Sequence, residues 1–321
     1  MNKARTLNYL IFALVAIMCL VCINTVDFMP KAEGSSNETE ITDPIEKDDD
    51  VPEIDIDDPA QTVGALYKKG DSAKAWQTAY DRFKTASGYK SVITGTMSYY
   101  AVGGIVNVNQ NVYTSRVRYT NGDQLSTTKT TGTKTSNGET YYDLNRGMVY
   151  DHCDDEVVTD TLSNWVSVRG IGPNGFNYVI NESTIAKETS FKQRVNGNFE
   201  FTIQLVTNGK ATEAYAKYIN YCGKSVLGSI MPIFNYNKIT FTVNSKGDFV
   251  KIVAEDDYYF NASVGEITGS SKITETFTAF RPYPVSKPSW LQKYVKHCHY
   301  YKPDCHTNCG NLFVYMATFG H

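Results

Sequence analysis

The stretch Lys238–Phe280 reads KITFTVNSKGDFVKIVAEDDYYFNASVGEITGSSKITETFTAF and contains three runs of alternating apolar and polar residues. In the first run, Ile239, Phe241 and Val243 share one side. Residues Asn244–Asp248 then predict a turn, because Asn and Asp tolerate left-handed backbone and Gly adopts positive φ freely. A period of two predicts an antiparallel sheet with one buried face and one solvated face.

The second and third runs continue this alternation. The positions on the expected buried side are Val250, Ile252, Ala254, Tyr258, Phe260, Ile267, Ile273, Phe277 and Ala279. The positions on the opposite side are Lys251, Glu255, Asp257 and four threonines of Glu266–Phe280. The stretch therefore predicts three neighbouring strands joined by short turns.

More strands are predicted upstream by β-rich runs that alternate with Gly-containing turns. Asn-Gly between such runs is a strong hairpin signal, and it occurs at Asn121, Asn137 and Asn196. The expected strands are Tyr89–Ala101, Ile105–Tyr119, Gln124–Thr131, Glu139–Leu144, Met148–Cys153, Ser183–Arg194 and Asn198–Val206. No crossover helices separate them, which disfavours a doubly wound parallel sheet.

Two amphipathic helices are expected among these strands. Asp71 predicts an N-cap for a helix that runs to about Ser87. Its apolar stripe contains Trp76, Tyr80 and Phe83. Thr212–Cys222 predicts a second, shorter helix. We therefore expect a mainly β (α+β) fold, an incomplete antiparallel β-barrel of about ten strands wrapped around one long and one short helix, because wrapping hides the most apolar area.

The N-terminal residues indicate export. Lys3 and Arg5 precede the uncharged apolar run Tyr9–Ile23, which predicts a signal peptide or signal anchor within residues 1–26. A lipid anchor is disfavoured, since Met18 and Val21 stand where a small residue should precede Cys19 or Cys22. The expected location is extracytoplasmic, membrane-anchored or secreted, in a chain of bacterial appearance.

The rest of the chain divides by composition. Residues 27–58 predict an acidic, extended tether, because Glu33–Asp58 carries 12 acidic residues against one base. Residues 59–286 form the expected β domain, and residues 287–321 a Cys/His/Tyr-rich tail. Outside the acidic segment the basic residues are spread along the strands and not clustered, which argues against nucleic-acid binding.

Three groups of residues contain side chains that could form a chemical site. Asp151–Asp155 includes His152 and could serve as a general base, but a solvated strand end is the simpler interpretation. Gly170–Gly175 fits G-x-G-x-x-G, yet it lacks the surrounding βαβ unit and predicts a loop. A zinc site in the tail is disfavoured by its cysteine spacing, and a disulfide or a free tail remains open. The tail residues concerned are His297, Cys298, His299, Cys305, His306 and Cys309.

The sequence as a whole predicts neither a catalytic site nor a metal or other cofactor. It contains no Ser-His-Asp grouping, G-x-S-x-G, H-E-x-x-H or P-loop, and four of its five histidines lie at or after His297. We therefore do not expect an enzyme. Cys153 and Cys222 could pair, a question that the sequence leaves open.

The order of the elements resembles that of a known family. An export signal, an acidic tether, the Trp76 helix, strands, a second helix and the closing run through Val243–Ile252 are similar to the LolA-like superfamily of bacterial lipoprotein carriers and lipid-binding lipoproteins. The resemblance covers roughly Gly64–Phe280. It implies an incomplete antiparallel barrel around an apolar cavity that helices close, and a ligand that is a lipid or an acyl chain.

We therefore expect a membrane-tethered binding protein that holds a lipid or lipoprotein acyl group in an apolar half-barrel. The expected lining residues are Trp76, Tyr80, Phe83, Ile239, Phe241, Val250, Ile252, Ile273 and Phe277. The alternative is an envelope structural or interaction module whose core is filled by side chains and which presents its outer face to a protein partner.

Overall fold

The computed structural model describes residues 53–54, 66–101, 107–133, 135–153, 156–173, 175–207, 209–227, 230–262 and 265–295. The predicted export signal, nearly all of the tether and the Cys/His cluster of the tail lie outside these ranges. Within them, no helix is both long and apolar enough to cross a bilayer. The two residues of the expected tether that are described, Glu53–Ile54, form strand β1 and pair with β8.

The described residues form one antiparallel sheet with helices packed on it. The strands are β1 (Glu53–Ile54), β2 (Tyr89–Ala101), β3 (Asn107–Arg118), β4 (Gln124–Gly132), β5 (Ser136–Asp143), β6 (Met148–Cys153), β7 (Glu156–Thr161), β8 (Ile185–Arg194), β9 (Phe199–Leu205), β10 (Ile233–Val243), β11 (Phe249–Ala262) and β12 (Gly265–Phe280). The helices are α2 (Ser72–Thr85), α3 (Leu162–Arg169), α4 (Glu213–Leu227) and α5 (Leu291–Val295), with a 3₁₀ turn η2 (Gly209–Ala211).

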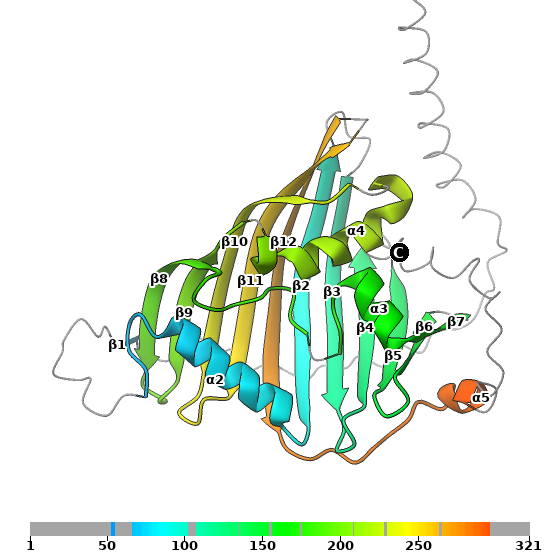
Figure 1. The fold of residues 1–321 in the computed structure, drawn as a ribbon, viewed down its shortest axis with the longest axis horizontal. Coiled ribbons are helices and arrows are strands. Elements are labelled where there is room, and N and C mark those ends of the chain that lie inside the picture. The colour runs from blue at the N-terminus through cyan, green and yellow to red at the C-terminus, as the bar shows by residue number, and fades with distance from the viewer. Residues whose placement is uncertain are drawn as a thin grey trace, which may run out of the picture. The chain divides into compact units, whose positions relative to one another are not determined.

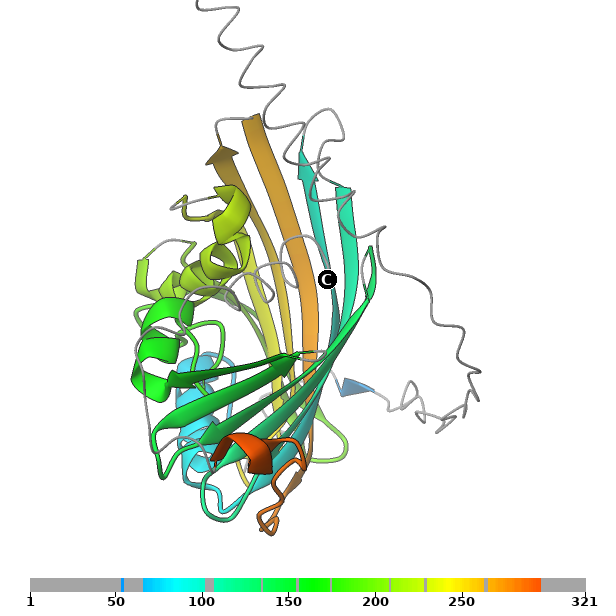
Figure 2. The same ribbon diagram turned by 90° about the vertical axis from the view of Figure 1, so that its right-hand side faces the viewer.

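The strand order is β1-β8-β9-β10-β11-β12-β2-β3-β4-β5-β6-β7. Two meanders, β2–β7 and β8–β12, are thus joined where β12 pairs with β2. The sheet curves strongly, and α2, α3 and α4 lie on its concave side (Figures 1 and 2). The described chain therefore has the fold expected from the sequence, an incomplete antiparallel barrel. The second long helix, α4, is not shorter than α2, and α3 adds a third.

The Asn-Gly turn expected at Asn137 is wrong. Asn137 and Gly138 lie inside β5, where Gly138 pairs with Cys153 of β6. The chain reverses earlier, after Gly132, whose φ of 126° suits glycine. The strands β2 and β6, in contrast, have the bounds that the alternation predicts.

The N-terminus of α2 is capped from outside the helix. Asp71 occupies the N-cap position, but its side chain makes no capping hydrogen bond. Instead the Glu188 carboxylate of β8 accepts hydrogen bonds from the backbone N–H of Gly70, at 2.7 Å, and of Ser72, at 3.2 Å. A carboxylate satisfies these N–H groups and also complements the positive end of the helix.

The apolar stripe of α2 packs into an aromatic cluster on the concave face. The Trp76 ring lies 5.2 Å from that of Phe241 and 5.0 Å from that of Phe249, between centroids. Phe83 contacts Phe277 at 5.8 Å. Side chains therefore fill this end of the half-barrel.

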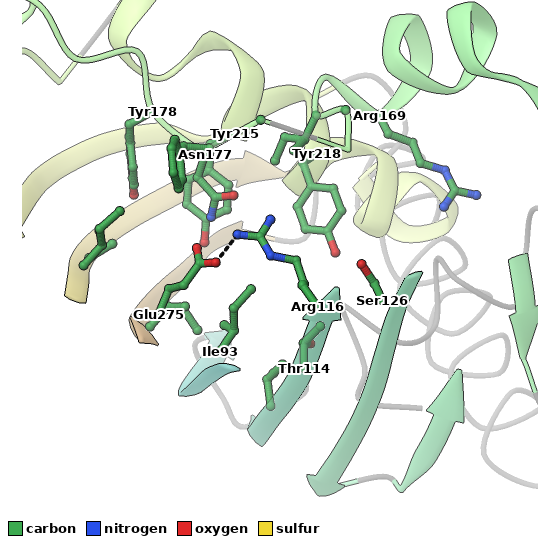
Figure 3. A pocket seen from close by; sticks show the side chains of 18 of the residues that line it. Ile93, Thr114, Arg116, Ser126, Arg169, Asn177, Tyr178, Tyr215, Tyr218 and Glu275 are labelled. Carbon is green, nitrogen blue, oxygen red and sulfur yellow. Dashed lines mark hydrogen bonds and ion pairs between the residues drawn. The ribbon is translucent and has the colours of Figure 1, made fainter. Parts of the chain in front are cut away.

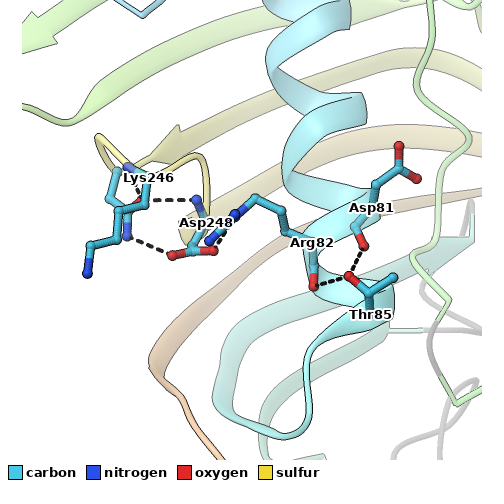
Figure 4. Close-up of polar contacts among 6 residues, drawn as sticks. Asp81, Arg82, Thr85, Lys246 and Asp248 are labelled. Carbon is cyan, nitrogen blue, oxygen red and sulfur yellow. Dashed lines mark hydrogen bonds and ion pairs between the residues drawn. The ribbon is translucent and has the colours of Figure 1, made fainter.

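A polar contact fixes the other side of α2 to the turn that joins β10 and β11. Arg82 Nε donates a hydrogen bond to Asp248 Oδ1 at 2.6 Å (Figure 4). The turn itself is held by Asn244 Oδ1, which accepts from the backbone N–H of Lys246 and of Asp248, both at 2.9 Å. The turn predicted at Asn244–Asp248 is confirmed.

Two of the β-bulges change which of the expected side chains face the core. Thr242 pairs with Lys251 but Val243 pairs with Phe249, so Val250 is the extra residue and Phe249 takes the buried position. In β12, Phe277 pairs with Ser91 and Ala279 with Lys90, which turns Ala279 toward the outer face. Bulges bend and twist a strand, so this pair contributes to the curvature of the sheet.

The C-terminal segment packs on the convex face. Tyr283 and Leu291 are buried against Tyr119, Tyr141 and Tyr150 in a second hydrophobic cluster. The Trp290 indole N–H donates to Glu139 Oε2 at 2.5 Å. The described part of the expected tail, up to Val295, is therefore attached to the sheet.

Candidate amphipathic cavity

A cavity of about 290 Å³ lies between the concave face of the sheet and the elements that cover it. The sheet contributes residues of β2–β5 and β10–β12, and the cover consists of α3, α4, Trp76 of α2 and the segment 171–180. Figure 3 shows side chains from both sides pointing into this space. The volume is near the lower end of the range of small-molecule sites, roughly 300–1,000 Å³.

One wall of the cavity is apolar. Ile239, Ile252, Ala254 and Ile273 line it from β10, β11 and β12. They meet there because the inward positions of adjacent strands stand in rows: Ile239 is opposite Ala254, which is opposite Ile273. From the cover, aromatic and aliphatic side chains complete this wall, namely Trp76, Ile171, Phe176 and Ile180.

The other wall is polar, and its residues also come from inward positions that lie opposite one another on adjacent strands. Arg116 of β3 stands opposite Ser126 of β4, which stands opposite Thr140 of β5 and then Asp151 of β6. The next row brings Thr114 opposite Thr128. These residues alternate along their strands with outward-facing ones, so β3–β5 present mainly polar side chains to the cavity. The side chains that β10–β12 present to it are mainly isoleucine and alanine, and Glu275 of β12 is the charged exception.

Two buried ion pairs flank the polar wall. Arg116 binds the Glu275 carboxylate of β12 through Nη2 (Figure 3), and both side chains are about nine-tenths buried. Arg169 of α3 places Nη1 at 3.7 Å from Asp151 Oδ2. Burial raises the pKa of Asp151 to about 6, opposed by the charge of Arg169 and by a hydrogen bond that Thr140 donates at 2.7 Å. Each guanidinium thus has a carboxylate beside it.

A third buried carboxylate lies behind the tyrosines at one end of the cavity. Asp256 Oδ2 accepts hydrogen bonds from the Tyr178 hydroxyl at 2.7 Å and from Ser271 Oγ at 2.8 Å. Burial raises the pKa of Asp256 to about 7. Its second oxygen, and the amide of Asn237 directly opposite on β10, are buried with no hydrogen-bond partner among the described residues.

Only some of the nine residues that the sequence predicts to line a cavity do so in the structure. Trp76, Ile239, Ile252 and Ile273 do line it. Phe83, Phe241 and Phe277 are buried in the filled aromatic cluster beside it, and Tyr80 packs against that cluster. Val250 is the bulged residue described above. The structure therefore brings four of the nine together at the cavity.

The polar wall was missed by reasoning from hydrophobic alternation. A signal was nevertheless present: in Gln124–Gly132 the positions on one side are Gln124, Ser126, Thr128 and Thr130, and none of them is apolar. A strand with this composition does not build an apolar core. The order of the strands decides which distant carboxylate pairs with Arg116. That order cannot be deduced from the local sequence pattern.

The other groups of residues that could form a chemical site have simple structural positions. Asp151 and His152 point to opposite faces, as alternation requires; Asp151 is buried, however, and not solvated. The His152 ring lies 4.9 Å from that of Trp290 on the convex side. Gly170 ends α3 with a φ of 76°, and residues 170–173 and 175 are in neither a helix nor a strand, as expected for a loop. The side chain of Cys222 and the tail cysteines lie outside the described residues.

Comparison with solved structures gives distant likenesses, among them a bacterial lipoprotein-sorting domain and a DUF1329 family protein. No family model matches the chain, and no curated protein matches it. A domain from Vibrio parahaemolyticus, described as an outer membrane lipoprotein-sorting protein, shows 9% identity and a TM-score of 0.24, over 70% of this chain and 97% of that one. A DUF1329 family protein from Desulfovibrio piger ATCC 29098 shows 10% identity and a TM-score of 0.24, with the same coverage.

The first of these descriptions names the kind of protein that the order of elements resembles. At such TM-scores neither likeness carries an argument about function.

Proposed function

We propose that this protein binds a lipid or a lipoprotein acyl group in the cavity under α3 and α4. The observation that supports this is the unfilled space of about 290 Å³ with Ile239, Ile252 and Ile273 on one wall. Each methylene group that moves from water into such an apolar environment contributes about 0.8 kcal/mol. The role is binding, and no catalytic step is assigned to it.

The proposed setting is the outer side of a cytoplasmic membrane, with the chain tethered or exported by its N-terminus. The support comes from sequence alone, from the apolar run Tyr9–Ile23 behind Lys3 and Arg5. The acidic segment that follows is long enough to separate the β domain from a membrane surface. An envelope protein that delivers or receives the ligand is a further part of this proposal.

A matched pair of variants on β11 tests the binding role. Ala254 lines the apolar wall, and its neighbour Val253 is not among the cavity residues because it points to the other face. Ala254→Phe adds a ring inside the cavity, whereas Val253→Phe adds the same ring outside. The protein is purified in a mild detergent-free buffer, and its bound lipid is measured by native mass spectrometry and by solvent extraction.

We expect lipid with the wild type and with Val253→Phe, and a loss of at least tenfold with Ala254→Phe. Folding of each variant is checked by thermal unfolding. If wild-type protein remains empty after incubation with mixed lipid vesicles, the proposal is wrong. A chain with a filled interior that binds partners through its outer face would then be favoured.

A further inference from the structure

We propose that the ligand carries an uncharged head group rich in hydroxyl or ester oxygens, of the kind found in a monoacylglycerol. This inference rests on the proposed binding function and specifies the class of ligand for the same cavity. It follows from how the charges and the hydroxyl groups of the polar wall are arranged.

The charges that line the cavity cancel in pairs. The charged lining residues are Arg116, Arg169 and Glu275. Arg116 is bound by Glu275, and Arg169 lies beside Asp151. Although two guanidinium groups reach this wall, neither stands as an open counter-ion for a phosphate or a carboxylate.

An anionic head group would have to displace a buried partner. If a phosphate took the guanidinium of Arg116, the carboxylate of Glu275 would lose its cation while its side chain is only 8% exposed. A buried charge that loses its partner is strongly unfavourable. Asp256, at the tyrosine end, adds a further carboxyl group and no positive charge. A cationic head group meets the same obstacle at Glu275 and Asp151, which already have their cations. Asp256 is not a lining residue of the cavity, because Tyr178 and Ser271 cover its carboxyl group.

The hydroxyl groups suit a neutral head. Thr114 and Thr128 hydrogen-bond each other at 3.0 Å, and Ser126 accepts a bond from Gln124 Nε2 at 3.2 Å. A hydroxyl can donate one bond and accept two, so these groups retain capacity for a ligand. In Figure 3 the hydroxyls of Ser126 and Tyr218 point into the same space from the sheet and from α4. Hydroxyl and ester oxygens are the complementary partners.

The apolar wall fixes the orientation of such a ligand. The isoleucines of β10–β12 stand at one side of the cavity and the hydroxyls of β3 and β4 at the other. A single-chain amphiphile therefore lies across the concave face, with its acyl chain toward Ile239 and Ile273 and its head toward Ser126.

The test compares two probes that differ by one phosphate: 1-oleoylglycerol and 1-oleoylglycerol-3-phosphate. The full chain is delipidated, and both probes are added at equal concentration at pH 7.5. Native mass spectrometry then gives the ratio of the two complexes. We expect the neutral probe to exceed the phosphate by at least tenfold in the wild type.

Glu275→Gln supplies the charge test, because it leaves Arg116 without its carboxylate. We expect the ratio to shift toward the phosphate by at least tenfold. The control is Glu255→Gln, which removes a carboxylate from an outward ion pair with Lys238, at 2.9 Å, and should leave the ratio unchanged. If Glu275→Gln does not fold, the double variant Arg116→Met with Glu275→Met replaces the pair by apolar groups. It should keep the neutral preference of the wild type.

The two proposals fail in different ways. Binding of neither probe by folded wild-type protein overturns the proposed function. Binding of the phosphate as strongly as, or more strongly than, the neutral probe overturns the inference about the head group and leaves the binding function standing. An unchanged ratio in folded Glu275→Gln also overturns the inference.

Discussion

At the scale of single residues, the buried position of Asp256 disfavours the ionised form of its carboxyl group. Its carboxyl group lies under Tyr178 and Ser271, and burial raises its pKa from 3.8 to about 7. Burial also raises the pKa of Tyr178 well above 10, so this phenol remains a hydrogen-bond donor at neutral pH. The folded chain therefore holds a proton on Asp256 at pH values where the unfolded chain has released it.

This predicts a pH dependence of stability with a definite sign. Between about pH 4 and pH 7 the folded state binds more protons at Asp256 than the unfolded state, so the free energy of unfolding falls as the pH rises through this window. The contribution of Asp256 is complete below pH 4 and lost above pH 7. At about 1.4 kcal/mol per pKa unit, the change is of the order of a few kcal/mol.

The variant Asp256→Asn separates this effect from that of Asp151, whose raised pKa acts in a lower window. Asparagine keeps an oxygen to accept from Tyr178 and Ser271 but does not ionise. The free energy of unfolding is measured in urea at pH 4 and at pH 8 for both proteins. We expect the value for the variant minus that for the wild type to be higher at pH 8 than at pH 4. An equal stability difference at both pH values would contradict the assignment.

At the scale of single elements, α2 depends on a residue of another element. Asp71 stands where the sequence predicts the cap, yet the Glu188 carboxylate of β8 makes the hydrogen bonds. Glu188→Ala is expected to destabilise the protein by about 1 kcal/mol, the usual value for a lost N-cap. Chemical denaturation measures this loss of stability. The control is Lys187→Ala, because Lys187 is the exposed neighbour of Glu188. A greater loss with Lys187→Ala would contradict this role of Glu188.

The elements also show where local pattern is a sufficient guide. The strand-like run Met148–Cys153 predicts β6 with its observed bounds, because the turn signal Asn145–Gly147 marks where the strand begins. Alternation fails at Val250, since a bulge depends on the register of β10 against β11 and not on β11 alone. It fails again for the polar wall, where Arg116 and Glu275 lie 159 residues apart in the chain.

At the scale of the whole molecule, the sheet has a core on both faces. The concave face carries the aromatic cluster and the cavity, and the convex face carries the cluster around Tyr141, Tyr283 and Leu291. Composition suggested a tail beyond residue 286, because three prolines end the strand pattern. Packing after the prolines could not be predicted from local sequence, since the cluster that Leu291 joins is built by residues far away in the chain, among them Tyr119, Tyr141 and Tyr150.

Leu291→Ala tests this outer attachment. Leu291 is fully buried, and removing a buried leucine side chain typically costs about 2–5 kcal/mol. We expect a lower melting temperature and faster proteolysis after residue 281, with lipid binding by folded protein unchanged. The control is Val285→Ala, because Val285 is 42% exposed. Equal effects of the two variants would show that the segment does not contribute to the fold.

The pairing of β12 with β2 has a consequence for how the chain acquires its structure. Residues that face each other there, such as Ser98 and Ser270, are 172 positions apart. Closing so long a loop is entropically costly and slows folding. While the chain is being synthesised, β2 has an open edge until the last strand emerges, and an open edge invites pairing with other chains. A nascent chain that stops before β12 therefore leaves the edge of β2 without its partner strand.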